Sequence, residues 1–253
     1  MARRRRTKRH RHHFGSSILY KILSVVIISA AIVAALVMFF KVSTIQVSGV
    51  TKYSEEEIIA ASGIEVGDNL FLLNEYEIYD SIIEKLPYVS SVSISRVFPS
   101  GVVIEVTGKN QGGILTYGHE YWVMSSRGDL LGKRAEPGSG ARILGIDIQE
   151  PRVGAAIDPV EEDERKVTEL LALLDALEEK GMLTGVKQMN FTEDSVISMD
   201  YADRFHVILL YGADYTYKLT QLSAVIEKLE QQGDLREGTV DLTHEGRVHF
   251  IPD

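Results

Sequence analysis

The hydrophobic pattern of the chain begins with one long stretch that contains no charged residue. Residues 22–40 (ILSVVIISAAIVAALVMFF) form an apolar run of 19 positions. As an α-helix rising about 1.5 Å per residue, this run is roughly 28 Å long, close to the hydrocarbon thickness of a bilayer. Signal-peptide cores are shorter, about 7–15 residues, and end at a small-residue cleavage site, whereas the alanines here lie mid-run. We therefore interpret residues 22–40 as an uncleaved transmembrane helix, in preference to a cleaved signal peptide.

A second pattern starts directly after this run, with no linker between them. In residues 41–58 (KVSTIQVSGVTKYSEEEI), Ile45 and Val47, with Val50 beyond a turn-forming Gly49, predict one short strand with a buried face. Ser54 and Glu57 then have the spacing of a capping box and predict the start of a helix. A folded module is therefore expected to begin at the membrane surface, where it would stay close to other membrane-anchored proteins.

The same module is predicted to continue as helix, strand, strand. Asn74 and Glu77 repeat the capping signature before apolar positions at helical spacing, and Pro87 ends this second helix. Residues 92–96 and 102–106 then alternate on either side of an FPSG turn. The predicted order over residues 43–109 is strand, helix, helix, strand, strand.

Residues 110–253 predict a second, β-rich module with two helices. The first helix is expected to start at Asp158, with Pro159 at its first position, and to end at Gly181. The second is expected between a capping Asp214 and Gly233. Apolar runs predict strands at residues 114–117, 121–124, 130–131, 142–146, 186–191, 196–201, 205–211, 239–242 and 247–251. The last two of these strands are expected to form a C-terminal hairpin. The predicted fold class is α+β.

The charge distribution gives the apolar run a direction. Residues 1–21 hold eight of the 27 Lys and Arg residues and no acid, so they carry +8, whereas the remaining 19 bases face 36 acids. The positive-inside rule places residues 1–21 in the cytoplasm as a basic tail and residues 41–253 outside. Attraction to anionic lipid accounts for such a cluster, so we favour lipid over nucleic acid as its partner. The absence of cysteine excludes disulfides and thiolate catalysis.

Motifs that would indicate catalysis, a cofactor or a metal are incomplete in this sequence. Residues 132–134 (GKR) lack the other residues of a phosphate-binding loop, and the His-Glu pairs at 119–120 and 244–245 lack the second His of a zinc-protease helix. Asp200 and Asp203 fall at a polar turn, where Asp is expected for turn formation. We therefore predict no enzyme activity, no cofactor and no metal site.

Five motifs, in this order, carry a resemblance to a known family. They are V-x-x-I-x-V-x-G at 42–49, R-x-F-P-x-x-V-x-I-x-V at 96–106, YWVMSSRGDLLG at 121–132, YKLTQL at 217–222 and VDL at 240–242. Their order, and the position of the first directly after a single anchor, resemble the bacterial division proteins FtsQ and DivIB. The resemblance implies a POTRA domain over residues 43–109 and an FtsQ/DivIB-type β domain over residues 110–253.

The resemblance also implies a function and a binding surface. It implies a non-catalytic divisome assembly protein of the cytoplasmic membrane, enriched at the septum, that helps regulate septal wall synthesis. Its expected partners are coiled-coil membrane proteins like FtsB (DivIC) and FtsL, which bind the last strand and the preceding helix. Carried over by motif, the partner-binding residues are Thr243, His244, Arg247, Val248 and Phe250. A final strand with a free edge can accept a partner strand, although for Phe250 simple core packing is an equal alternative.

Two other function classes remain open at this stage. POTRA domains also occur in export, secretion and envelope-assembly factors, which would work beside substrates or a barrel partner instead of at mid-cell. A membrane-anchored hydrolase would need a pocket with converging polar side chains.

Overall fold

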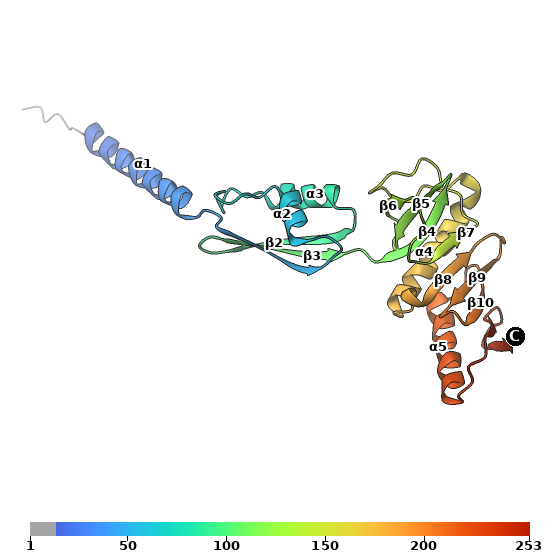
Figure 1. Ribbon diagram of the computed structural model, residues 1–253. Coiled ribbons are helices and arrows are strands. Elements are labelled where there is room, and N and C mark those ends of the chain that lie inside the picture. Colours follow the sequence, from blue (N-terminus) through green and yellow to red (C-terminus); the bar gives the residue numbers. More distant parts are fainter. Residues whose placement is uncertain (1–13) are drawn as a thin grey trace, which may run out of the picture.

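The computed structural model describes residues 14–253 as a long helix followed by two α+β modules (Figure 1). Most of the predicted basic tail lies outside the described residues. Helix α1 (Phe14–Phe39) begins before the apolar run and includes a segment, Leu19–Phe39, that is long and apolar enough to cross a membrane. No part of that segment is buried inside the protein. Among the described residues it is the one helix with these properties.

The first module has the predicted order of strand, helix, helix, strand, strand. Its elements are β1 (Thr44–Val50), α2 (Glu55–Ser62), α3 (Glu75–Lys85), β2 (Val89–Val97) and β3 (Gly101–Gly108). The sheet order is β1-β3-β2, with β1 parallel to β3 and β2 antiparallel to it. Both helices lie on one face of this sheet (Figure 1) and bury apolar residues such as Ile58 and Ile82 against Val102 and Ile104.

The helix starts in this module follow from their capping residues. The Ser54 hydroxyl accepts a bond from Glu57 N, and the Glu57 carboxylate accepts one from Ser54 N, so the predicted capping box is confirmed. The Asn74 side chain accepts its bond from Tyr76 N instead of from Glu77 N, so the second predicted box forms only as a simple cap. Each cap satisfies a backbone N–H that has no partner within the helix.

The predicted strand is confirmed through Val50, but the turn predicted at Gly49 is wrong. Gly49 lies inside β1, where it pairs with Val106 of β3 and has φ +112°. A Cβ atom at this position would lie 1.8 Å from the Val106 carbonyl oxygen. Glycine is therefore required here by the close approach of two strands, and the chain does not reverse direction.

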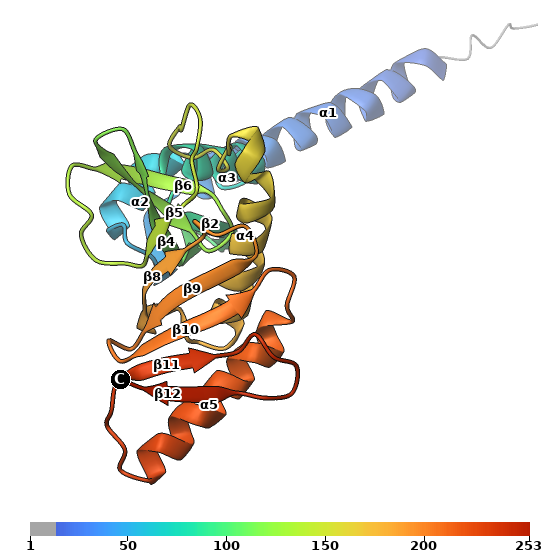
Figure 2. The same cartoon turned by 90° about the vertical axis from the view of Figure 1, so that its right-hand side faces the viewer.

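The second module is built on one nine-stranded sheet in the described part of the chain. The strand order is β12-β11-β10-β9-β8-β7-β4-β5-β6. Helices α4 (Glu164–Glu179) and α5 (Tyr215–Gln231) lie against the same face of this sheet (Figure 2) and share its apolar core. The strands are β4 (Gln111–Tyr117), β5 (Glu120–Ser125), β6 (Leu130–Arg134), β7 (Arg142–Leu144), β8 (Val186–Asn190), β9 (Val196–Tyr201), β10 (Phe205–Leu210), β11 (Gly238–Asp241) and β12 (His249–Pro252).

The first helix of this module begins later than predicted. The segment at Asp158 and Pro159 pairs with residues 147–149, since Gln149 N donates to Asp158 O and Pro159 forms a bridge with Ile148. A 3₁₀ turn follows, and α4 starts only at Glu164. Pro159 therefore lies within a strand-like pairing, which continues to Val160 N and Asp147 O, instead of opening a helix.

Candidate partner-binding edge

Strand β12 is one edge of the nine-stranded sheet. It pairs with β11 alone, antiparallel, with Val240 opposite Phe250 and Thr239 opposite Ile251 (Figure 2). The strand itself begins at His249, two residues after the predicted start at Arg247. The predicted C-terminal hairpin is present, and its last strand occupies the sheet edge.

The hydrogen-bonding pattern defines which backbone groups of β12 face away from β11. Gly238 N donates to Arg204 O on the other side, and Asp253 N donates to Glu237 O. Because bonded and non-bonded pairs alternate in an antiparallel ladder, the Phe250 N–H and C=O point to the open edge. The other outward residue of β12, Pro252, has no N–H. Phe250 thus supplies the one outward N–H donor within β12.

The five predicted binding residues divide into two groups. His244 and Arg247 are exposed in the β11–β12 loop. Thr243 is held in that loop, because its N–H and hydroxyl both donate to the Asp241 carboxylate at 2.8 and 2.7 Å. Val248 and Phe250 are partly buried against the core, and the Phe250 ring lies 6.2 Å from that of Phe205. For Phe250 the side chain packs inward while the backbone faces the open edge.

Two charged residues that were not predicted shape the loop beside this edge. Lys218 of α5 is buried, and its Nζ donates to the His244 carbonyl oxygen at 2.7 Å. Its position three residues after Tyr215, within the apolar stripe of α5, is the sequence signal that could have indicated its burial. Asp241 accepts the two bonds from Thr243, and these bonds, with His244 and His249 nearby, lower the pKa of its carboxyl.

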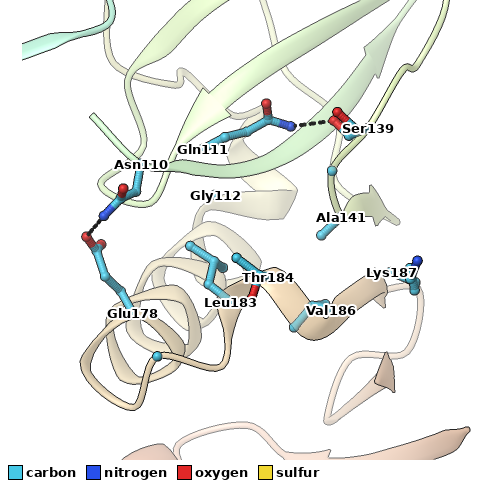
Figure 3. Close-up of a pocket in the computed structure, with 12 residues that line it drawn as sticks. Asn110, Gln111, Gly112, Ser139, Ala141, Glu178, Leu183, Thr184, Val186 and Lys187 are labelled. Atoms are coloured by element: carbon cyan, nitrogen blue, oxygen red, sulfur yellow. Dashed lines mark hydrogen bonds between the residues drawn. The ribbon is translucent and has the colours of Figure 1, made fainter. Parts of the chain in front are cut away.

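Two of the hollows in this module lie beside its helices. One, of about 500 Å³, lies between the start of α5 and the β11–β12 loop, and includes Lys218 and Thr243 in its lining. Figure 3 shows the other, of about 530 Å³, where Asn110 donates to Glu178 and Gln111 donates to the Ser139 carbonyl. Ser126 and Asn110 lower the pKa of the Glu178 carboxyl. Within residues 14–253 no group of three or more His, Asp or Glu side chains is arranged to hold a metal ion.

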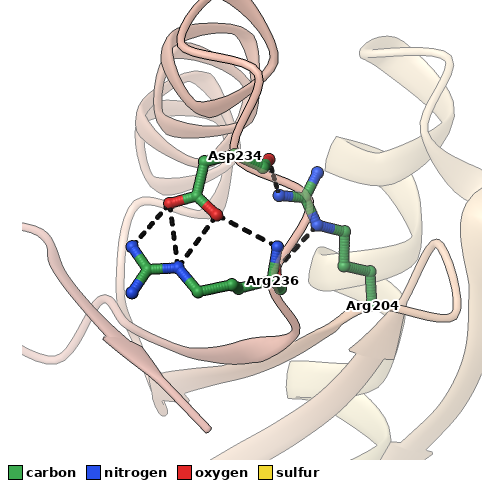
Figure 4. Close-up of polar contacts among 3 residues, drawn as sticks. All are labelled: Arg204, Asp234 and Arg236. Atoms are coloured by element: carbon green, nitrogen blue, oxygen red, sulfur yellow. Dashed lines mark hydrogen bonds and ion pairs between the residues drawn. The ribbon is translucent and has the colours of Figure 1, made fainter.

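Three charged residues fix the segment that leads from α5 into β11 (Figure 4). Arg204 donates from Nε to Arg236 O at 2.9 Å and from its terminal nitrogen to Asp234 O. The Arg236 side chain pairs with the Asp234 carboxylate at 2.7 Å. This arrangement holds β11 parallel to β10, and therefore sets the position of β12 at the sheet edge.

Acid is expected to remove the contribution of Asp234 to stability. Hydrogen bonds from Arg236 lower the pKa of the Asp234 carboxyl to about 2, below the value of about 3.9 for an unfolded Asp. The contribution is therefore complete above about pH 4 and is lost as the pH falls toward 2. We expect Asp234→Asn to unfold at a lower temperature than the wild type at pH 7, and the difference to shrink as the pH falls from 4 to 2.

The fluorescence of Trp122, the sole Trp of the chain, which is buried in this module, reports the transition. Asp203→Asn is the control, because Asp203 is an exposed carboxylate of the same module that pairs only with Lys187 in the described residues. If the difference in unfolding temperature between the wild type and Asp234→Asn were the same at pH 2 as at pH 7, the ionised Asp234 carboxylate would not be the source of the stabilisation.

Comparison with known proteins identifies the first module and shows that much of the chain is similar to division proteins. Residues 40–107 match the model of the POTRA domain, FtsQ-type. The cell division protein FtsQ of Syntrophotalea carbinolica is 29% identical over 208 residues, 80% of this chain and 70% of that protein. FtsQ of Corynebacterium glutamicum is 26% identical over 163 residues, 63% of this chain and 70% of that protein. The cell division protein DivIB of Clostridium botulinum is 23% identical over 223 residues, 84% of this chain and 82% of that protein.

These matches agree with the architecture of the described residues. An apolar helix suited to a single membrane crossing precedes a module with the strand and helix order expected of a POTRA domain, and a sheet-rich module follows. The POTRA match covers the first module, and the relatives extend through much of the second. The first module is therefore a POTRA domain of the FtsQ type, and the chain is similar to the FtsQ and DivIB cell division proteins of bacteria.

Proposed function

We propose that this chain is a non-catalytic assembly protein of the divisome that binds coiled-coil membrane partners at the β12 edge. The partners are FtsB- or DivIC-like and FtsL-like proteins, and their capture helps regulate septal wall synthesis. The observation that carries this proposal is the unpaired edge of β12 in the described chain, with the Phe250 N–H and C=O directed outward. A partner segment in extended conformation would continue the sheet as a tenth strand.

The residues around this edge are mostly polar and include both signs of charge. His244 and Arg247 are exposed beside it, and the buried Lys218 ammonium lies under the same loop. The rest of the external region is strongly acidic, because 36 acids face 19 bases outside residues 1–21. Arg247 and Lys218 are balanced at this loop by Asp241 and Glu245, so the recognition rests on the backbone groups of β12 and on the exposed polar side chains beside it. We therefore assign Thr243, His244, Arg247, Val248 and Phe250 to the binding surface.

The orientation in the membrane is part of the same proposal. The excess of Lys and Arg before α1 supports an N-terminus in the cytoplasm, with residues 41–253 on the outer side. In this arrangement α1 is the anchor, residues 43–109 form the POTRA domain and residues 110–253 form the partner-binding domain. The change from β3 to β4 takes only two residues, Lys109 and Asn110.

The proposal includes no catalytic step. The one carboxylate pair that the sequence offered as a candidate, Asp200 and Asp203, forms polar contacts with other side chains. Asp200 contacts His206 Nδ1 at 2.7 Å, and Asp203 pairs with Lys187 at 3.2 Å. Each carboxylate therefore has its own partner on a neighbouring strand or turn.

A fluorescent fusion of the full chain, observed in dividing cells of its own host, tests this function. We expect the signal to concentrate at the division septum, and we expect a chain that ends at Gly246 to lose co-purification with the FtsB- or DivIC-like partner. A uniform membrane signal through the division cycle would contradict the proposal and would favour an export or envelope-assembly factor.

A further inference from the structure

Four exposed apolar side chains gather at the end of the POTRA domain that adjoins α1. Phe71 is 49% exposed, Leu72 76%, Val97 51% and Phe98 56%. They come from the α2–α3 loop and from the β2–β3 turn, which Figure 1 shows at the end of the module where α1 enters. We call these four residues the collar. Exposure of several large apolar side chains in one place is characteristic of an interaction surface.

The collar is one contiguous surface although its two segments are distant in sequence. The rings of Phe71 and Phe98 lie 5.6 Å apart. Both rings also contact Phe40, the first residue after α1, at 5.0 and 5.8 Å. The aromatic cluster therefore connects the end of α1 to both collar segments.

The polarity of β2 changes only where the strand reaches the collar. Its exposed alternate positions are Ser91, Ser93 and Ser95, followed by Val97. A solvent-facing strand surface is normally polar throughout, and the three serines follow that pattern. Val97, the position nearest α1, departs from it in the direction expected of an apolar environment.

Hydrogen bonds hold the collar loop to the last turn of α1. The Asn69 side-chain amide donates to the Leu36 and Val37 carbonyl oxygens at 3.2 and 3.1 Å, and Leu70 N donates to Phe40 O at 2.9 Å. The last four carbonyls of a helix have no partner within it, and the Asn69 amide supplies donors to two carbonyls of the last turn of α1. Because the loop caps α1, Phe71 and Leu72 must lie at the level where α1 leaves the bilayer.

We propose that the collar is embedded in the outer interfacial layer of the bilayer that α1 crosses, so that the POTRA domain rests on the lipid surface. The proposal depends on the membrane placement of α1 proposed above. The segment Leu19–Phe39 has 21 residues, about 31 Å of helix, which fills the hydrocarbon layer and leaves its end at the interface. Phe and Leu side chains of interfacial segments bury at the boundary between the headgroups and the acyl chains. The collar is therefore expected to contact lipid, and this lipid is continuous with the lipid around α1.

The chain has no cysteine, so single Cys variants can carry a nitroxide label without any other change. We would place labels at Leu72→Cys and Phe98→Cys in the full chain, reconstituted in nanodiscs of phosphatidylethanolamine and phosphatidylglycerol. Ala31→Cys, in the middle of α1, is the lipid reference. Val50→Cys is the matched aqueous reference, because Val50 is an apolar side chain, 87% exposed, in the last position of β1. Power saturation with oxygen and with a water-soluble nickel chelate reports the environment of each label.

We expect the ratio of oxygen to nickel accessibility at Leu72→Cys and Phe98→Cys to exceed that at Val50→Cys several-fold and to approach that at Ala31→Cys. Ratios equal to that at Val50→Cys, with Ala31→Cys in lipid, would overturn the collar proposal and leave the anchor intact. Low accessibility to both reagents would also overturn it, since a protein would then cover the collar. An aqueous signal at Ala31→Cys would instead contradict the membrane placement of α1.

Discussion

Phe250→Pro is expected to weaken binding of the FtsB- or DivIC-like partner roughly 5- to 150-fold more than Phe250→Ala does. Both variants lose the packing of the Phe250 ring against Phe205, but only proline also removes the outward N–H. A partner carbonyl left without its bond in a buried interface costs about 1–3 kcal/mol, which corresponds to that loss of affinity. Because this N–H makes no bond to β11, the hairpin itself is expected to stay paired in both variants.

Calorimetric titration of the full chain in nanodiscs with the extracytoplasmic region of the partner measures the effect. Ile251→Pro is the matched control, because the Ile251 N–H faces β11 and its loss disrupts the hairpin itself. A chain that ends at Gly246 lacks β12 and defines complete loss of strand addition. Equal affinities for Phe250→Pro and Phe250→Ala would mean that no partner group accepts a bond from this edge.

The sequence was sufficient for the local elements and insufficient for their pairing. Alternation, capping residues and Gly or Pro at element ends predicted the order of the POTRA elements and the C-terminal hairpin, because each of these signals acts over a few residues. The order of the nine strands depends on contacts between distant segments, such as β4 beside β7 and β10 beside β11. Periodicity carries no information about which strands become neighbours.

The same limit explains what was missed at the candidate site. The hairpin and its five binding residues were predicted from the chain order and from the resemblance, and their role in binding stays a prediction. The outward direction of the Phe250 N–H follows from bonds made by Gly238 and Asp253, which no local pattern encodes. Likewise, the local pattern predicts that Pro159 opens a helix. In the structure Pro159 instead pairs with Ile148, a residue outside the predicted helix, and the helix starts later.

Gly49→Ala is expected to destabilise the POTRA domain more than any other alanine substitution proposed here. Gly49 has φ +112°, and its new Cβ would lie 1.8 Å from the Val106 carbonyl oxygen. Neither atom can move without separating β1 from β3, because Val106 O belongs to the backbone of the central strand. Strain at positive φ costs about 1–3 kcal/mol, and the overlap adds about another 1–3 kcal/mol.

Gly67→Ala separates the two costs of the Gly49 substitution. Gly67 has φ +108°, almost the same as Gly49, but a Cβ there would have no atom within 4 Å. An alanine at position 67 therefore bears the conformational strain without the steric overlap.

We expect hydrogen exchange in β1 and β3 of the full chain to accelerate strongly in Gly49→Ala and only modestly in Gly67→Ala. Trp122 fluorescence should remain unchanged in both, because that residue lies in the other module. Equal exchange in the two variants would show that β1 and β3 separate at little cost, and the close approach at Gly49 would then no longer explain why glycine is needed there.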